Sequence, residues 1–197
     1  VFLEILPDYH FKRIAVNAKA DGDFETLITL NDVPRTAEIH VQLVEQKSGA
    51  VVGEFSQTVD SDSVWLSHSF QGVKSWDPET PILYNARFSL RLNKKILYQK
   101  IEKIGFRTVE LTGKDGIYIN DVKVILKGVN RHSFYPTTGR ALSEANHLED
   151  IMLMKEMNMN AVRMSHYNPD ERFLELADSL GLFVLDEVTG WQDGYDT

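Results

Sequence analysis

Histidine, arginine and carboxylate side chains follow three short apolar runs in the second half of the chain. They are Asn130, Arg131 and His132 after the first run, Arg163, Ser165 and His166 after the second, and Asp186 and Glu187 after the third. Parallel strands of β/α units present polar groups in this way at the carboxyl edge of a sheet. The pattern predicts one site, built at a common rim by three strands that form part of a (β/α) barrel.

His132 and His166 are the strongest candidates for ligand contact, because two histidines on neighbouring strand ends would converge on one crevice. A neutral imidazole both donates and accepts hydrogen bonds, which suits the recognition of hydroxyl groups. We group Asn130 with them as a binding residue. The alternative for each histidine is an ordinary loop position without a ligand.

Arg163 lies inside its expected strand, where a buried charge must be paired. A structural salt bridge to Glu187 or Asp186 is favoured over ligand contact. Asp186 and Glu187 are not interpreted as a catalytic pair, because adjacent strand residues point to opposite faces. The members of a catalytic carboxylate pair would have to face each other across the reacting bond, which neighbours on one strand cannot do. We therefore expect these two carboxylates to support and position other groups.

Trp191 follows the third run in V-T-G-W-Q-D-G. An exposed aromatic ring after a barrel strand is a platform on which an apolar face of a ligand can stack. An anchor that packs the loop onto the domain surface remains an equal alternative.

The first part of the chain, residues 1–109, reads as strands. Ile39, Val41 and Leu43 alternate with His40 and Gln42, and this period of two recurs in the run 88–92. About seven short strands separated by turn residues are typical of an immunoglobulin-like sandwich.

In the second part, residues 110–197, the period at which apolar residues recur changes. A hairpin is expected over 111–124 with Asn120-Asp121 at its turn. Ser143 is a helix N-cap, and the apolar stripe of that helix comprises Leu148, Ile151, Met152 and the stem of Lys155. A second helix begins at Pro169, with its stripe at Phe173, Leu176, Ala177 and Leu180 and a terminating Gly181. The order β-α-β-α-β predicts parallel strands.

Composition narrows the classes of function. The 197 residues carry a net charge of −8, which disfavours a nucleic-acid partner, and no cysteine, which excludes disulfides. No apolar run approaches the roughly 20 residues of a membrane span. The histidine spacing shows no metal motif, and no nucleotide-binding glycine loop occurs, so no metal and no cofactor is predicted. The chain begins at Val1 without a leader, which suggests an excised piece and leaves its localisation open.

Residues 160–187 resemble the signature of glycoside hydrolase family 2, the family of β-galactosidases, β-glucuronidases and β-mannosidases. The matching positions are Asn160, Arg163, Ser165, His166, Tyr167, Asp178, Gly181, Asp186 and Glu187. G-V-N-R-H at 128–132 is similar to the preceding strand of that family, W-D-P-E-T-P-I-L-Y at 76–84 to a segment of its sandwich, and 105–110 to the exit strand of the sandwich. Met164 and the additional Asn168 depart from the pattern.

The resemblance implies an immunoglobulin-like sandwich at 1–109, followed at 110–197 by the first strands of an incomplete (β/α)8 barrel. It implies a retaining exo-β-glycosidase, with β-galactosidase as first choice, whose histidines matching His132 and His166 bind the sugar. In the family both catalytic glutamates lie on later strands, so no catalytic residue is assigned here and the chain alone is expected to be inactive. The magnesium ligands of large bacterial β-galactosidases would fall at Trp191 and Asp193, so that metal site is not carried over.

The expected partners are a carbohydrate substrate and the remainder of the same chain, with self-association of the open barrel when that remainder is absent. The alternative function is a non-catalytic carbohydrate-binding or structural sandwich module. An Asn-Glu pair at the end of a fourth strand would distinguish the enzyme from the module.

Overall fold

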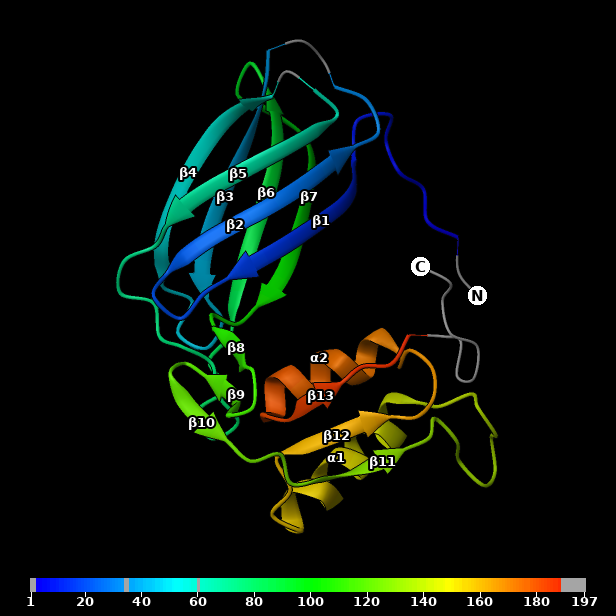
Figure 1. The fold of residues 1–197 in the computed structure, drawn as a ribbon. Helices are drawn as coiled ribbons and strands as arrows, with labels where there is room; N and C mark the ends of the chain where they lie inside the picture. The colour runs from blue at the N-terminus through cyan, green and yellow to red at the C-terminus, as the bar shows by residue number, and fades with distance from the viewer. Residues whose placement is uncertain (1–2, 34–35, 60, 189–197) are drawn as a thin grey trace. The chain divides into compact units, whose positions relative to one another are not determined.

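The chain forms two compact units in the computed structural model, which describes residues 3–33, 36–59 and 61–188 (Figure 1). The first unit comprises Val1–Trp76 and Ile82–Val109, and the second comprises Asp77–Pro81 and Glu110–Thr197. In the described part of the chain, no helix combines the length and the apolar character needed to cross a membrane.

The first unit is a sandwich of two antiparallel sheets. Its described residues form the seven strands β1 (Phe11–Ala18), β2 (Asp23–Leu30), β3 (Ala37–Glu45), β4 (Val51–Val59), β5 (Ser63–Ser69), β6 (Tyr84–Leu92) and β7 (Lys95–Ile104). One sheet has the order β1-β2-β5 and the other has the order β4-β3-β6-β7. The sandwich expected from the alternating pattern is confirmed.

The core of the sandwich comes from alternate residues of facing strands. Ile39 lies opposite Leu90 and Val41 lies opposite Phe88 across β3 and β6, and all four side chains are fully buried. Phe24, from the other sheet, stacks on Phe88 with ring centroids 6.4 Å apart. A period of two therefore separates core from surface along these strands, as the sequence predicts.

The expected exit strand over 105–110 does not form, and this prediction was wrong. β7 ends at Ile104, and Phe106 makes only an isolated bridge with Ser75 before its ring enters the core. A Cβ atom on Gly105 would lie 2.9 Å from the Cβ of Trp76, so the chain passes too close to that side chain to continue a regular strand. The strand β8 (Val109–Thr112) then begins a different sheet.

A three-stranded sheet of order β10-β9-β8 opens the next part of the chain, with β9 at Gly116–Ile119 and β10 at Val122–Val124. β9 and β10 form the expected hairpin. Its turn residues Asn120 and Asp121 have φ angles of 51° and 66°, which asparagine and aspartate adopt more readily than most residues.

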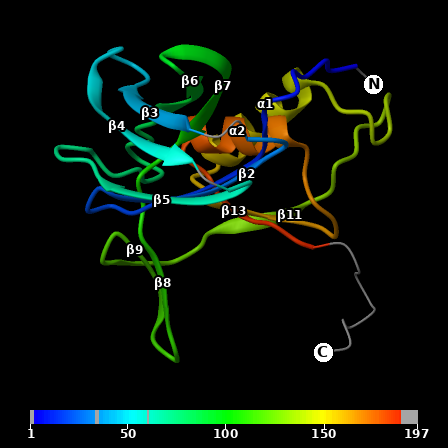
Figure 2. The same ribbon diagram turned by 90° about the horizontal axis from the view of Figure 1, so that it is seen from above.

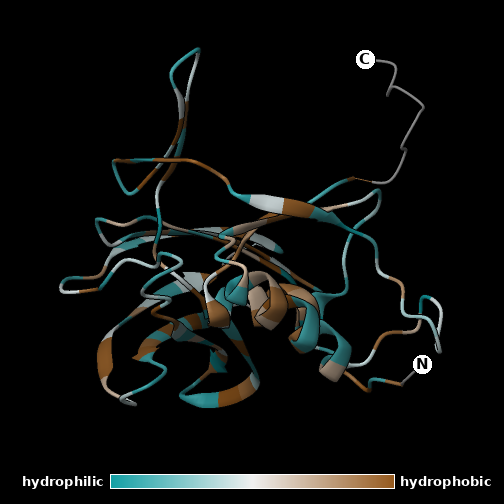
Figure 3. Cartoon of the chain, turned by 90° about the horizontal axis from the view of Figure 1, so that it is seen from below, coloured by the Kyte–Doolittle hydropathy of each residue, from teal (hydrophilic) through white to brown (hydrophobic). Residues whose placement is uncertain are grey.

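The second unit contains a parallel β/α arrangement, as predicted. Its elements are β11 (Gly128–Arg131), α1 (Glu144–Glu156), β12 (Ala161–Met164), α2 (Glu171–Leu180) and β13 (Phe183–Leu185). The strands are parallel in the order β11-β12-β13. Both helices lie on the same side of this sheet, and brown and teal segments alternate along them in the hydropathy view (Figures 2 and 3).

The helix boundaries follow local chemistry. Ser143 caps α1 in a capping box with Asn146, and Asp170 caps α2, so Pro169 precedes the cap rather than occupying the first turn. Gly181 ends α2 in the left-handed conformation with φ 76°. The predicted stripe of α2 is confirmed, because Phe173 and Ala177 are buried and Leu176 and Leu180 pack against the same cluster.

The predicted apolar stripe of α1 was wrong, because the buried face of the helix is displaced by one residue from most of the predicted positions. The buried residues are His147, Ile151 and Met154, whereas Leu148 and Met152 are exposed. The helix therefore buries a histidine side chain. A hydropathy pattern does not predict this, because polar contacts stabilise His147 in the interior.

The segment Asp77–Pro81 groups with the second unit because Lys155 and Gly181 bind it. Lys155 Nζ donates to the carbonyl oxygens of Pro78 at 3.2 Å and of Gly181 at 2.9 Å. A Cβ atom at position 181 would lie 2.1 Å from the Pro78 oxygen, so the close approach requires glycine.

We expect residues 1–109 to fold without the rest of the chain, because the buried residues of the sandwich core all lie within this range. A dispersed amide NMR spectrum of the 1–109 polypeptide checks this expectation. Phe24→Ala, which removes a fully buried ring and costs about 3–5 kcal/mol, provides the destabilised reference. A collapsed spectrum of the unmodified 1–109 polypeptide would contradict it.

Candidate functional site

The candidate site lies where the three parallel strands end. Asn130 pairs with Arg163 and Arg131 pairs with Met164 in the parallel register, so the residues that follow β11 and β12 emerge at the same edge of the sheet. β13 ends at Leu185, immediately before the two carboxylates. The strand ends thus bring together polar residues that are more than fifty positions apart in the sequence.

His132 and His166 lie together at this edge. Their ring centroids are 5.4 Å apart with an interplanar angle of 75°, and the Tyr167 ring lies 6.3 Å from His132. The Ser165–His166 peptide bond is cis. His132 is exposed, and its ring nitrogens have no hydrogen-bond partner within the described ranges. This ring can therefore donate to, and accept from, a polar ligand.

Glu187 binds two of the predicted site residues at once. Its Oε1 forms an ion pair with Arg163 Nη2, and its Oε2 lies 3.1 Å from His166 Nδ1. Arg163 Nη2 lies 3.4 Å from the same Nδ1, but a guanidinium only donates, so the shorter carboxylate contact decides the tautomer. His166 therefore donates from Nδ1 to Glu187.

Asn130 belongs to the same group through Arg163, since its Oδ1 accepts from Arg163 Nη1 at 3.3 Å. Asp186 has a different partner: the Asn168 amide donates to its carboxylate oxygens at 3.4 Å. The two neighbouring carboxylates thus bind different groups and do not face each other as a pair. The ion pair of Arg163 is with Glu187, one of the two partners considered from the sequence.

Arg131 was named from the sequence among the polar residues expected at the rim, but it is buried and holds the strand end in place. Its guanidinium is buried, donates to Asp150 Oδ2 from Nε at 2.8 Å and from Nη2 at 2.7 Å, and lies 4.4 Å from the centroid of the Phe173 ring. Nη2 also donates to His147 Nδ1 at 3.2 Å. Asp150 and His147 are three residues apart on α1, and this spacing is the signal that could have suggested a shared partner.

His147 is neutral in this network. Burial lowers its pKa below 6.5, the Arg131 charge lowers it further, and Asp170 and Asp150 oppose the shift. Because Nδ1 accepts from Arg131, the ring proton is on Nε2, which lies 4.0 Å from Asp170 Oδ1. Asp170 is the cap of α2, so the network reaches both helices.

Trp191, the remaining predicted binding residue, lies outside the described residues, as does Asp193. Among the described residues no group of three or more histidine and carboxylate side chains is arranged to hold a metal ion.

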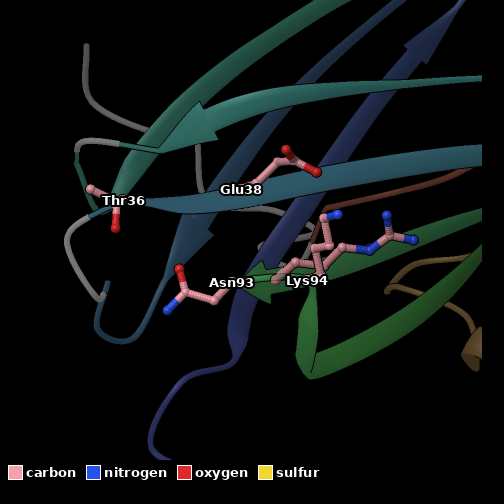
Figure 4. Close-up of a pocket in the computed structure, with 5 residues that line it drawn as sticks. Thr36, Glu38, Asn93 and Lys94 are labelled. Atoms are coloured by element: carbon pink, nitrogen blue, oxygen red, sulfur yellow. The ribbon is translucent and has the colours of Figure 1, made fainter.

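Two hollows lie on the sandwich. The larger, of about 500 Å³, is lined by Thr36, Glu38, Arg91, Asn93 and Lys94 (Figure 4). The smaller, of about 170 Å³, lies over the outer residues of β3, β6 and β7, including His40 and Ser89. Neither is lined by a Phe, Tyr or Trp side chain.

Two family models match the chain in succession. Residues 4–107 match the model described as glycosyl hydrolases family 2, and residues 109–195 match its TIM barrel domain. The chain belongs to glycosyl hydrolase family 2. The region matched by the barrel model includes every residue of the site described above.

Curated relatives are bacterial β-galactosidases. The enzyme of Halalkalibacterium halodurans is 34% identical over 194 residues, which cover 95% of this chain and 19% of that protein. The enzyme of Arthrobacter sp. is 44% identical over 117 residues, covering 59% of this chain and 11% of that protein. The chain thus spans about a fifth or less of the length of the curated relatives that it matches.

Solved structures share the fold of the chain. A family 2 member from Bacteroides cellulosilyticus superposes with a TM-score of 0.82 at 24% identity, over 96% of this chain and 26% of that one. A Bifidobacterium dentium β-glucuronidase complexed with coumarin-3-O-glucuronide gives a TM-score of 0.83 at 21% identity, over 92% and 31%.

Asp150→Asn is expected to destabilise the second unit by about 2 kcal/mol. It leaves the buried Arg131 charge without its counterion, although the partial exposure of Asp150 reduces the loss below that of a fully buried pair. Native-state hydrogen exchange of the β12 amides measures the change. Glu149→Gln, an exposed position one residue earlier, should stay within about 0.5 kcal/mol, and equal effects of the two variants would refute the role of Arg131.

The second unit is also expected to lose stability as the pH falls below about 6.5. The unfolded chain then binds a proton at His147 that the folded chain resists, because the folded pKa is lower. Hydrogen exchange at about pH 8 and about pH 5 measures the loss. His147→Gln removes the titrating group, so its stability should depend less on pH; an unchanged dependence would show that other groups cause it.

Proposed function

We propose that the whole protein is a retaining exo-β-glycosidase that removes a terminal β-linked sugar, and that the sugar is a β-galactoside. The identity of 34% with a β-galactosidase over 95% of the chain supports this assignment. The observation that carries it is the pairing of His132 and His166 at one rim, 5.4 Å apart, with Glu187 fixing the second ring.

In this proposal residues 1–109 are an immunoglobulin-like sandwich domain and residues 110–197 are the N-terminal part of a (β/α)8 barrel. The open edges of the parallel sheet support it: β11 and β13 are the outer strands, and Val129 and Leu185 on them are exposed apolar residues. Further strands of the same chain would cover these edges. When they are absent, a second copy would cover them by self-association.

The rim is suited to a neutral sugar. The exposed His132 ring can bind hydroxyl groups, and His166 and Asn130 lie at the same edge. The Arg163 guanidinium already pairs with Glu187, so it is not a free cation for the carboxylate of a uronic acid. Galactose, which has no charged group, therefore fits this part of the rim better than glucuronic acid. Trp191 would add a stacking surface in this proposal.

The described residues bind and orient rather than transfer protons to the substrate. Retaining hydrolysis needs an acid/base and a nucleophile, about 5–5.5 Å apart and on opposite sides of the anomeric carbon. Asp186 binds Asn168, whereas Glu187 binds Arg163 and His166, so this pair does not meet that requirement. Glu187 instead positions the His166 ring at the rim.

His132→Ala and His166→Ala in the whole protein should each lower kcat/KM on an aryl β-galactoside by about 10- to 100-fold, because each removes hydroxyl contacts that strengthen in the transition state. Steady-state kinetics measure the change. His10→Ala, which changes a histidine in the sandwich, should leave kcat/KM unchanged. If the whole protein cleaved no aryl β-glycoside, a non-catalytic binding module would be the better assignment.

The 197-residue chain, assayed in parallel, should show no turnover. If it did, and if Glu187→Gln abolished that turnover, Glu187 would be a catalytic group rather than the residue that positions His166. An aryl β-glucuronide in the same panel tests the neutral sugar: preference for the glucuronide would contradict the argument from the paired Arg163.

A further inference from the structure

Trp65 is exposed at the centre of a regular strand. It lies on β5, between the fully or largely buried Val64 and Leu66, and 67% of its own surface is accessible. Trp76, in contrast, is buried. An indole ring held outward by a well-packed strand leaves its apolar faces available to a ligand.

Trp65 belongs to an apolar strip that crosses the sheet β1-β2-β5, whose strands lie side by side in Figure 1. Leu27 lies directly opposite Trp65, and Ala15 lies directly opposite Leu27. Three strands at a spacing of about 4.8 Å make this strip roughly 10 Å long. The strip is one residue wide and ends at β5, which is an edge strand of the sheet.

Polar side chains flank the strip on both sides. The row on one side contains Ser67, Glu25 and Asn17, and the row on the other side contains Ser63, Thr29 and Arg13. All six positions share the outer face with the strip, because residues two apart on a strand point the same way. Asn17 Nδ2 donates to Glu25 Oε2 at 3.3 Å, which orients one of these rows.

We propose that this surface, the Trp65 strip with its two polar rows, binds a neutral β-linked oligosaccharide. The indole stacks on the apolar C–H face of a pyranose, while hydroxyl, amide, carboxylate and guanidinium groups on either side bind its equatorial hydroxyls. The site lies in the sandwich, and its chemistry stands whether or not the histidine rim binds galactose.

The composition of this surface disfavours a protein or a nucleic acid as the ligand. A protein partner would be expected to bury a wider apolar area than a strip of one residue's width. A nucleic acid would stack on Trp65 but would require a basic surface, whereas Glu25 lies beside the strip and the chain has a net charge of −8. A neutral polyhydroxyl ligand satisfies both the ring and the mixed polar rows.

The strip is held rigidly, so little order is lost on binding. Gln57 Nε2 on β4 donates to the Trp65 backbone oxygen at 3.1 Å and fixes the edge strand without using the indole. Val64 and Leu66 anchor the strand from beneath. Truncation of the exposed Trp65 side chain therefore leaves the core of the sandwich intact.

NMR titration of the 197-residue chain with β-1,4-galactotetraose, cellotetraose and mannotetraose, each up to about 10 mM, tests the proposal. At least one probe should shift the Trp65 indole signal together with the Glu25 and Ser67 amides. Trp65→Ala should weaken that binding by at least about tenfold, whereas Trp65→Phe should retain part of it. Ile96→Ala, which removes an exposed apolar side chain from β7, should bind as the unmodified chain does.

His132→Ala and His166→Ala separate this site from the rim. Shifts at Trp65 that persist in both variants support the proposal even if the whole protein proves inactive on galactosides. Three results would overturn it: no shift at Trp65 with any of the three probes, unchanged binding by Trp65→Ala with a native amide spectrum, or Trp65 shifts that depend on protein concentration alone. The last result would show that a second copy of the chain covers the strip.

Discussion

The second unit depends on one buried cation. Arg131 is the last residue of β11, which among the described residues pairs with β12 alone. Its guanidinium binds Asp150 on α1 and lies against Phe173 on α2. A single side chain thus connects a four-residue strand to both helices. Removal of a charge from water is costly, and here Asp150, His147 and the aromatic face together offset that cost. The position of the neighbouring His132 follows from this anchor.

Alternation along the strands divides structural from ligand-facing residues. Arg131 and its register partner Met164 are buried among the helices, whereas Asn130 and its partner Arg163 contact each other at the polar edge. One residue further on, His132 begins the loop. The same alternation that makes a sandwich strand amphipathic therefore places a buried anchor directly beside an exposed imidazole. The buried and the exposed position could exchange places only if the register of the pairing between β11 and β12 shifted by one residue.

Sequence patterns predicted the elements whose cause is local. The sandwich strands follow from alternating burial, and the start of α1 and the end of α2 follow from capping residues. Patterns failed where a residue distant in the sequence determines the structure. His147 is buried because Arg131 binds it, and the path after Ile104 is set by contact with Trp76. The rim residues were found because strand ends are local signals, but the contact of Glu187 with His166 was not foreseen.

The segment Asp77–Pro81 has a consequence for recombination between homologues. It is continuous in sequence with the sandwich strands, yet its Pro78 carbonyl is bound by Lys155 and lies against Gly181, where no side chain would fit. A chimera that exchanged residues 1–109 as a block would combine this loop with a foreign lysine and glycine. Residues 77–81, Lys155 and Gly181 should therefore come from the same parent protein in any chimera. Crossover points should be chosen so that they do not separate these residues.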